Sequence, residues 1–122
     1  MCLIGITNDD TKADSDWLCK KILSCKLWSE SGKSWAKNVK EMNYEILFVS
    51  QFTLYAVMKG TKPDFHKAMQ SEQSKIFYEA FLKDAKSSYN PDMIKDGQFG
   101  AMMDVGLVND GPVTIVLDSR DK

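Results

Sequence analysis

Two short stretches of the chain carry residue types that could do chemistry. Ser50, Gln51 and Thr53 interrupt an apolar run that begins at Tyr44, so each must find an internal partner or face a pocket. The second stretch is Asn-Asp-Gly-Pro at 109–112, the composition of a turn. Glycine tolerates the position before proline, and about 5% of X-Pro bonds in folded proteins are cis. Such a turn could direct backbone groups at a ligand.

The sequence contains one histidine, His66, two residues after Asp64. A serine or threonine triad would need this imidazole beside Ser50 or Thr53, with a carboxylate behind it. Asp64 is expected to be a poor partner because residues two apart on a turn rarely align, which disfavours a generic serine hydrolase. The spacings predict no metal site, no phosphate-binding loop and no cofactor. The residues alone therefore support a pocket hypothesis.

The composition limits the class of protein. A chain of 122 residues predicts one domain, 1–122, with a modest core. The 16 Lys and Arg nearly balance the 17 Asp and Glu, which disfavours a protein that binds nucleic acid through an overall positive charge. A local basic patch is still possible. Cys2, Cys19 and Cys25 form no C-x-x-C pair, which predicts free thiols in a reducing cytosol. No signal segment or membrane-spanning run is evident, so a soluble cytoplasmic protein is expected.

The hydrophobic pattern predicts alternating strands and helices. Apolar, β-prone runs predict strands at residues 2–6, 26–28, 44–49, 103–108 and 113–117. The run at 44–49 is nearly continuous and is expected to be buried on both faces. Apolar residues at helical spacing predict helices over 12–24 and 71–88, with Ser71 as a cap.

Two regions are less regular. Residues 35–42 are open between loop and strand, and residues 57–67 are expected to be a solvated loop with a positive bias. The runs 103–108 and 113–117 are expected to pair as a closing hairpin. The element order predicts an α/β (α+β-like) fold in which two helices cover one face of a mixed sheet.

The chemically suggestive stretches resemble the signatures of a known family. Residues 50–54, Ser-Gln-Phe-Thr-Leu, match the Ser-Gln-x-x-Thr/Leu signature of D-aminoacyl-tRNA deacylases, and residues 109–114 match their Asn-x-Gly-Pro-Val/Phe-Thr signature. Residues 59–66 and 94–101 also resemble eukaryotic-type members, so the resemblance covers essentially the whole chain. It implies the deacylase fold and hydrolysis of the ester that joins a D-amino acid, or glycine mischarged on tRNA-Ala, to the terminal adenosine of tRNA.

The resemblance also implies a homodimer with its active sites at the subunit interface. Gly111 and Pro112, joined by a cis bond, would reach into the partner's pocket, where main-chain atoms exclude L-side chains. Ser50, Gln51, Phe52 and Thr53 would hold the terminal adenosine and the ester, with N–H groups near Phe52 or Thr53 as oxyanion donors. Because the ester is activated and the ribose 2′-hydroxyl can assist, Thr53 is expected to position rather than attack.

Further residues have implied roles around this site. Phe99 and Met103 match pocket-lining positions and would pack the adenine, the alternative being simple core packing. Lys59, Lys62 and Lys67 are expected to meet tRNA phosphates as point charges.

One departure from the family lies at the front of the chain. Members normally begin with two strands before the one that corresponds to residues 2–6, so the chain is expected to be N-terminally truncated, with an exposed sheet edge. This departure opens an alternative function: a catalytically impaired nucleic-acid-binding or dimeric interaction protein on the same scaffold.

Overall fold

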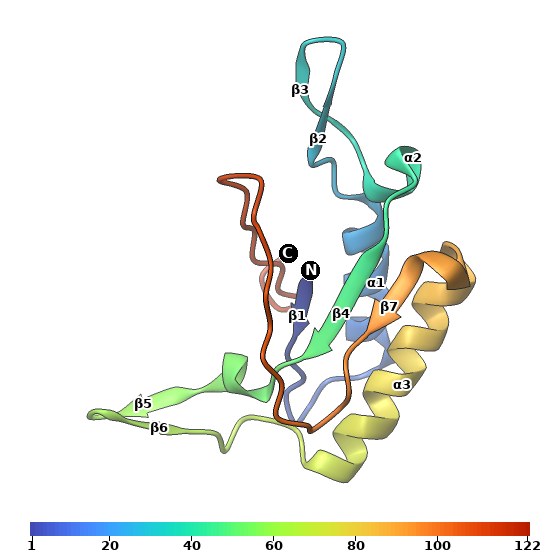
Figure 1. Ribbon diagram of the computed structural model, residues 1–122. Helices are drawn as coiled ribbons and strands as arrows, with labels where there is room; N and C mark the ends of the chain where they lie inside the picture. Colours follow the sequence, from blue (N-terminus) through green and yellow to red (C-terminus); the bar gives the residue numbers. More distant parts are fainter.

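A three-stranded parallel sheet forms the centre of the protein (Figure 1). The structure is a computed structural model, and it describes residues 1–122. The strand order is β1 (Cys2–Ile4), β4 (Ile46–Ser50) and β7 (Ile94–Asp96). Cys2 lies opposite Phe48, which in turn lies opposite Asp96. The α/β class is confirmed. The central sheet is all parallel, and antiparallel pairing occurs only in two hairpins.

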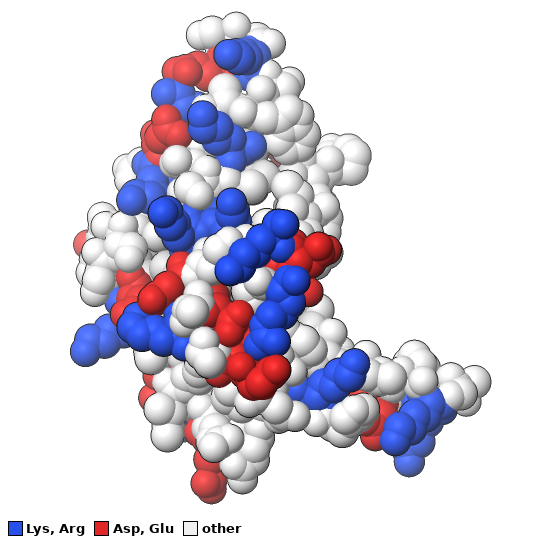
Figure 2. All heavy atoms as spheres, turned by 180° about the vertical axis from the view of Figure 1, so that it is seen from behind, with Lys and Arg blue, Asp and Glu red and all other residues white.

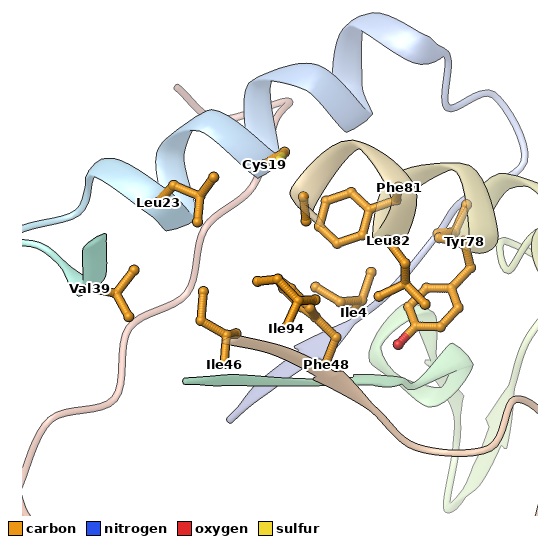
Figure 3. Packing of buried hydrophobic residues seen from close by; sticks show 12 residues of the cluster. Ile4, Cys19, Leu23, Val39, Ile46, Phe48, Tyr78, Phe81, Leu82 and Ile94 are labelled. Atoms are coloured by element: carbon orange, nitrogen blue, oxygen red, sulfur yellow. The ribbon is translucent and has the colours of Figure 1, made fainter. Parts of the chain in front are cut away.

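Two helices cover one face of this sheet, as predicted. They are α1 (Lys12–Ser24) and α3 (Ser71–Ser88), and they contact each other above the strands (Figure 3). α1 starts with a capping box, in which the Thr11 N–H donates to an Asp14 carboxylate oxygen at 2.9 Å. The prediction of Ser71 as a cap was wrong, because Gln70 occupies the cap position and makes no side-chain bond there.

The hydrophobic core lies between the helices and the sheet. Phe48 in β4 is 1% exposed and meets Phe81 of α3 edge-on, with ring centroids 5.2 Å apart (Figure 3). Leu47 is 37% exposed, whereas Val49, on the same face, is 6% exposed, so the expectation that β4 is buried on both faces holds at Val49 and was wrong at Leu47. Successive strand residues point to opposite faces, and the helices cover only one of them. Leu3 of β1 is exposed as well.

Two antiparallel hairpins project from this body (Figure 1). The first pairs β2 (Trp28–Glu30) with β3 (Lys33–Lys37) and is followed by the short helix α2 (Val39–Met42), which resolves the open region 35–42. The second pairs β5 (Val57–Lys59) with β6 (Lys62–Asp64).

The second hairpin corrects the prediction of a loop over 57–67. Lys59 lies opposite Lys62, so Gly60 and Thr61 form a two-residue turn, and Gly60 has φ +64°. Glycine at the first turn position suits a tight hairpin because it adopts positive φ without strain. Short polar strands of this kind lack the hydrophobic alternation on which the prediction depended.

The predicted closing hairpin is not formed. Residues 101–117 contain no strand, and residues 102–117 make no backbone–backbone hydrogen bond. Instead the segment runs past β1 to a tip and returns (Figure 1). Apolar side chains such as Val108 and Val116 are 97% and 89% exposed. These runs have β-prone side chains, but a strand also needs a neighbouring backbone to pair with, and this chain provides none here.

Tyr78 of α3 has an unusual position in the core. Its side chain is 3% exposed, and its hydroxyl is the one buried side-chain polar atom without a hydrogen-bond partner. Burial raises the pKa of this phenol, so the group stays neutral. A buried hydroxyl without a partner is destabilising.

Tyr78→Phe should therefore raise the free energy of unfolding by about 1 kcal/mol, which is a rise of a few degrees in Tm. Thermal unfolding followed by circular dichroism measures it. Tyr89→Phe is the control, because the Tyr89 hydroxyl donates to the Tyr44 carbonyl at 2.9 Å and its removal should lower Tm. A lower Tm for Tyr78→Phe would contradict the expectation.

Candidate active site

A pocket of about 640 Å³ lies where the three strands of the central sheet end. Its walls come from the ends of β1 and β4, the 3₁₀ turn η1 (Phe52–Tyr55), the connection into α3, and residues 98–105. Twelve of its 18 lining residues are hydrophobic, which is typical of a site that takes an apolar or aromatic group. Open parallel sheets commonly bind ligands at the carboxyl ends of their strands.

Five of the predicted site residues line this pocket: Ser50, Gln51, Phe52, Phe99 and Met103. They come from two stretches almost 50 residues apart in the sequence. β4 and β7 are parallel neighbours, so the residues that follow them emerge on the same edge of the sheet. The Gly97 N–H donates to the Phe48 carbonyl at 3.1 Å and continues this pairing beyond β7.

The sharp turn after β4 positions the polar residues. The Gln51 N–H donates to the Ile4 carbonyl at 2.7 Å, and η1 begins at the next residue. Phe52 and Thr53 are the first residues of this helical turn, so their N–H groups have no acceptor within it. The Gln51 side-chain amide donates to the Thr53 hydroxyl oxygen at 2.5 Å.

Two residues that support η1 were missed by sequence reasoning. A Cβ at Gly5 would lie 3.1 Å from both Leu54 Cβ and a Tyr55 ring carbon, so glycine permits the close approach of η1 to the end of β1. A lone glycine inside a predicted strand was the available signal. Phe65 meets the Phe52 ring edge-on, with centroids 5.1 Å apart, and nothing in the sequence pattern singled it out.

His66 and Asp64 correct one expectation. The His66 ring nitrogen Nδ1 hydrogen-bonds the Asp64 carboxylate, and the His66 backbone N–H donates to the same oxygen at 3.1 Å. These bonds hold the pKa of Asp64 at about 2. The prediction that the two residues would not align was therefore wrong. No triad follows, because the imidazole makes no hydrogen bond to Ser50 or Thr53.

The three predicted phosphate-contacting lysines lie outside the pocket. Lys59 and Lys62 face each other across the β5–β6 hairpin, and the Lys59 amine lies 3.5 Å from Asp64. Lys67 follows this arm, where its carbonyl accepts from the Thr7 hydroxyl at 2.6 Å. Figure 2 shows the basic side chains on the projecting arm.

Gly111 and Pro112 also lie outside the pocket of their own chain. The bond between them is cis, as the resemblance implies. Both residues are exposed, within the strandless segment 101–117. A Cβ placed on Gly111 would lie 2.4 Å from the Val113 backbone nitrogen, so the turn has no space for a larger residue.

A profile of the D-Tyr-tRNA(Tyr) deacylase family matches residues 1–118. The chain belongs to this family. Family members act on aminoacyl-tRNA. Among its relatives, the D-aminoacyl-tRNA deacylase of Dictyostelium discoideum is 60% identical over 124 residues, which cover 100% of this chain and 82% of that protein. D-aminoacyl-tRNA deacylase 1 of Homo sapiens is 52% identical over 96% of this chain, and the match spans 56% of the human protein's length.

Two solved structures are similar to this fold. One is described as c-Myc DNA unwinding element binding protein, with a TM-score of 0.88, 52% identity, and coverage of 93% of this chain and 76% of that chain. The other, a probable eukaryotic D-amino acid tRNA deacylase, has a TM-score of 0.74 over 90% of this chain and 79% of that chain. At 16% identity, the second similarity shows the fold alone. No helix of this deacylase-family chain has the length and hydrophobicity needed to cross a membrane.

Proposed function

We propose that this chain, acting as one domain over residues 1–122, hydrolyses the ester between a D-amino acid and the terminal adenosine of tRNA. Glycine mischarged on tRNA-Ala is the further substrate, and the cytoplasm is the site of action. The supporting observation is that the family's Ser-Gln-Phe stretch and the distant Phe99 and Met103 line one pocket. The reaction serves chiral proofreading in translation.

The pocket suits the terminal adenosine. Phe99 and Met103 supply an aromatic face and a polarisable thioether against which adenine can pack. Ser50 and Gln51 line the same pocket, where they can hydrogen-bond the ribose and the ester. A mostly apolar pocket with a few convergent polar groups fixes the orientation of such a ligand.

The chemistry needs few catalytic side chains. A water molecule attacks the ester carbonyl carbon, and the negative charge that develops on the carbonyl oxygen is stabilised by the N–H groups of Phe52 and Thr53. The bond to the ribose 3′-oxygen then breaks, and the neighbouring 2′-hydroxyl assists the proton transfer from within the substrate. No metal or cofactor takes part.

Chiral selection is assigned to a second copy of this chain. Gly111 and Pro112 do not line the pocket of their own chain, and the segment that carries them exposes apolar residues, among them Leu107 and Val108. A homodimer would cover these side chains and bring the turn to the partner's pocket. There its main-chain atoms exclude an L-side chain whatever its chemistry. Lys59, Lys62 and Lys67 would contact tRNA phosphates beside the site.

Thr53→Ala tests the proposed mechanism. The Thr53 hydroxyl accepts a hydrogen bond from the Gln51 amide and has no base beside it, so we assign it a positioning role. Losing one such bond should lower kcat for D-tyrosyl-tRNA by about tenfold or less. Single-turnover release of D-tyrosine measures this, with Thr61→Ala, in the hairpin turn, as the matched control. Near-complete loss of rate with tRNA binding intact would contradict the positioning role of Thr53.

A second candidate function is nucleic-acid binding or dimeric interaction without turnover. It is favoured by the 52% identity to a chain described as c-Myc DNA unwinding element binding protein. The basic β5–β6 arm is compatible with such contacts. A folded dimer that binds nucleic acid but cleaves neither D- nor L-aminoacyl-tRNA would favour this function over hydrolysis.

A further inference from the structure

A charge cluster fastens the C-terminal end of the chain to the connection between β1 and α1. The Arg120 guanidinium donates to three aspartates: to Asp9 through both terminal nitrogens at 3.2 and 3.1 Å, to Asp10 at 2.9 Å, and to Asp14 through Nε at 3.2 Å. One side chain thus makes four hydrogen bonds to residues more than 100 positions earlier in the sequence.

Two of the three acceptors, Asp10 and Asp14, also accept a hydrogen bond from a backbone N–H of their own segment. Asp10, whose side chain is 8% exposed, accepts the Thr7 N–H at 2.9 Å. Asp14 accepts the Thr11 N–H in the capping box of α1. That backbone bond, with smaller contributions that include Arg120, holds the pKa of Asp14 at about 2. Carboxylates fixed by their own backbone form a preorganised receptor for a planar guanidinium, unlike an isolated surface ion pair.

The long span before Arg120 has few other attachments. The Ala101 N–H donates to the Gln98 carbonyl at 3.2 Å, and Met103 packs against Gly97. The next backbone hydrogen bond is the turn bond from the Asp121 N–H to the Asp118 carbonyl at 3.1 Å, beside Arg120. The turn with Gly111 lies within this span.

We propose that Arg120 is a positioning residue for chiral selection. It fixes the downstream end of the span 104–117 and so sets where Gly111 and Pro112 stand relative to the sheet. The role in chiral selection rests on the proposed function. The anchoring of the span by Arg120 rests on the hydrogen bonds alone. Lysine cannot replace the guanidinium fully, because an ammonium group cannot make the bidentate bond to Asp9.

The structural test measures backbone order in the free protein. ¹⁵N relaxation gives order parameters for the amides of Asn109, Gly111 and Val113 in the wild type and in Arg120→Ala. We expect values typical of ordered backbone in the wild type, about 0.85, and a fall toward 0.6 or below in the variant. Lys33→Ala, which removes an exposed cation of strand β3 that makes no ion pair, should leave the order unchanged. Equal order parameters in the wild type and Arg120→Ala would overturn the proposal.

The functional test compares kcat/KM for D- and L-tyrosyl-tRNA. Arg120→Ala should lower kcat/KM for the D-substrate by about tenfold and narrow the ratio between enantiomers, since small displacements of positioning groups cost up to about 10²-fold. Arg120→Lys should have a ratio of kcat/KM for D- over L-tyrosyl-tRNA between those of Arg120→Ala and the wild type. Asp9→Asn should lower this ratio in part. An unchanged ratio in an active enzyme would overturn the proposal. If the wild type cleaves neither substrate, the proposed function fails, while the order parameters still decide whether Arg120 is an anchor.

Discussion

Phe48→Ala is expected to lower the free energy of unfolding by about 3–5 kcal/mol. Phe48 is 1% exposed in the central strand β4, and its ring meets Phe81 of α3. Its removal leaves a cavity between the sheet and the helix that well-packed neighbours cannot fill. For a domain whose total stability is about 5–15 kcal/mol, most of the margin would be lost.

Urea unfolding measures this change. Leu47→Ala is the matched control, because Leu47 is the next residue in the same strand but lies on the uncovered face, 37% exposed. Its substitution should cost clearly less. Equal losses at the two positions would mean that the face away from the helices is also buried in solution, for example by a partner subunit.

Gly111→Ala is expected to lower kcat/KM for D-tyrosyl-tRNA by about 10²-fold. The ratio of kcat/KM for D- over L-tyrosyl-tRNA should fall by the same factor. The added Cβ would lie 2.4 Å from the Val113 backbone nitrogen and 3.0 Å from the Asn109 side-chain nitrogen. Rotation of a side chain cannot relieve a clash with backbone, so the turn itself must move. A selector made of main-chain atoms fails when those atoms move.

Gly106→Ala is the control for this substitution, since a Cβ at Gly106 meets nothing within 4 Å. It changes the same exposed segment without displacing the turn. The kcat/KM values for D- and L-tyrosyl-tRNA should therefore stay near those of the wild type. Tm should change little in either variant, because Gly106 and Gly111 lie outside the hydrophobic core. A Gly111→Ala enzyme that keeps its preference for the D-substrate would remove this turn from the selection mechanism.

Local patterns predicted the elements that depend on local interactions. Apolar residues at helical spacing predicted α1 and α3, and both helices lie within one residue of the predicted bounds. The continuous run at 44–49 predicted the central strand. The convergence of Ser50 with Phe99 was implied by the resemblance, and the parallel pairing of β4 with β7 explains it.

The failures arise from contacts, local and non-local, that the hydrophobic pattern does not report. The runs 103–108 and 113–117 have strand-like side chains, but pairing depends on a neighbouring backbone that the pattern does not report. The β5–β6 hairpin is short and polar, so its order depends on the turn at Gly60. No sequence pattern identified the partners of Arg120, because they lie far away in sequence, in the β1–α1 connection. Charged residues on loops also follow no periodic spacing that would predict a contact.

Paired release of D-tyrosine and L-tyrosine from charged tRNA tests the central claim most directly. The measurement uses the wild-type chain, with its fold checked by circular dichroism and its dimeric state by sedimentation. We expect rapid release of D-tyrosine above the spontaneous rate and no acceleration for L-tyrosyl-tRNA. Cleavage of both enantiomers would contradict selection by the Gly111–Pro112 main chain. Cleavage of neither by a folded dimer would contradict the deacylase function of this chain.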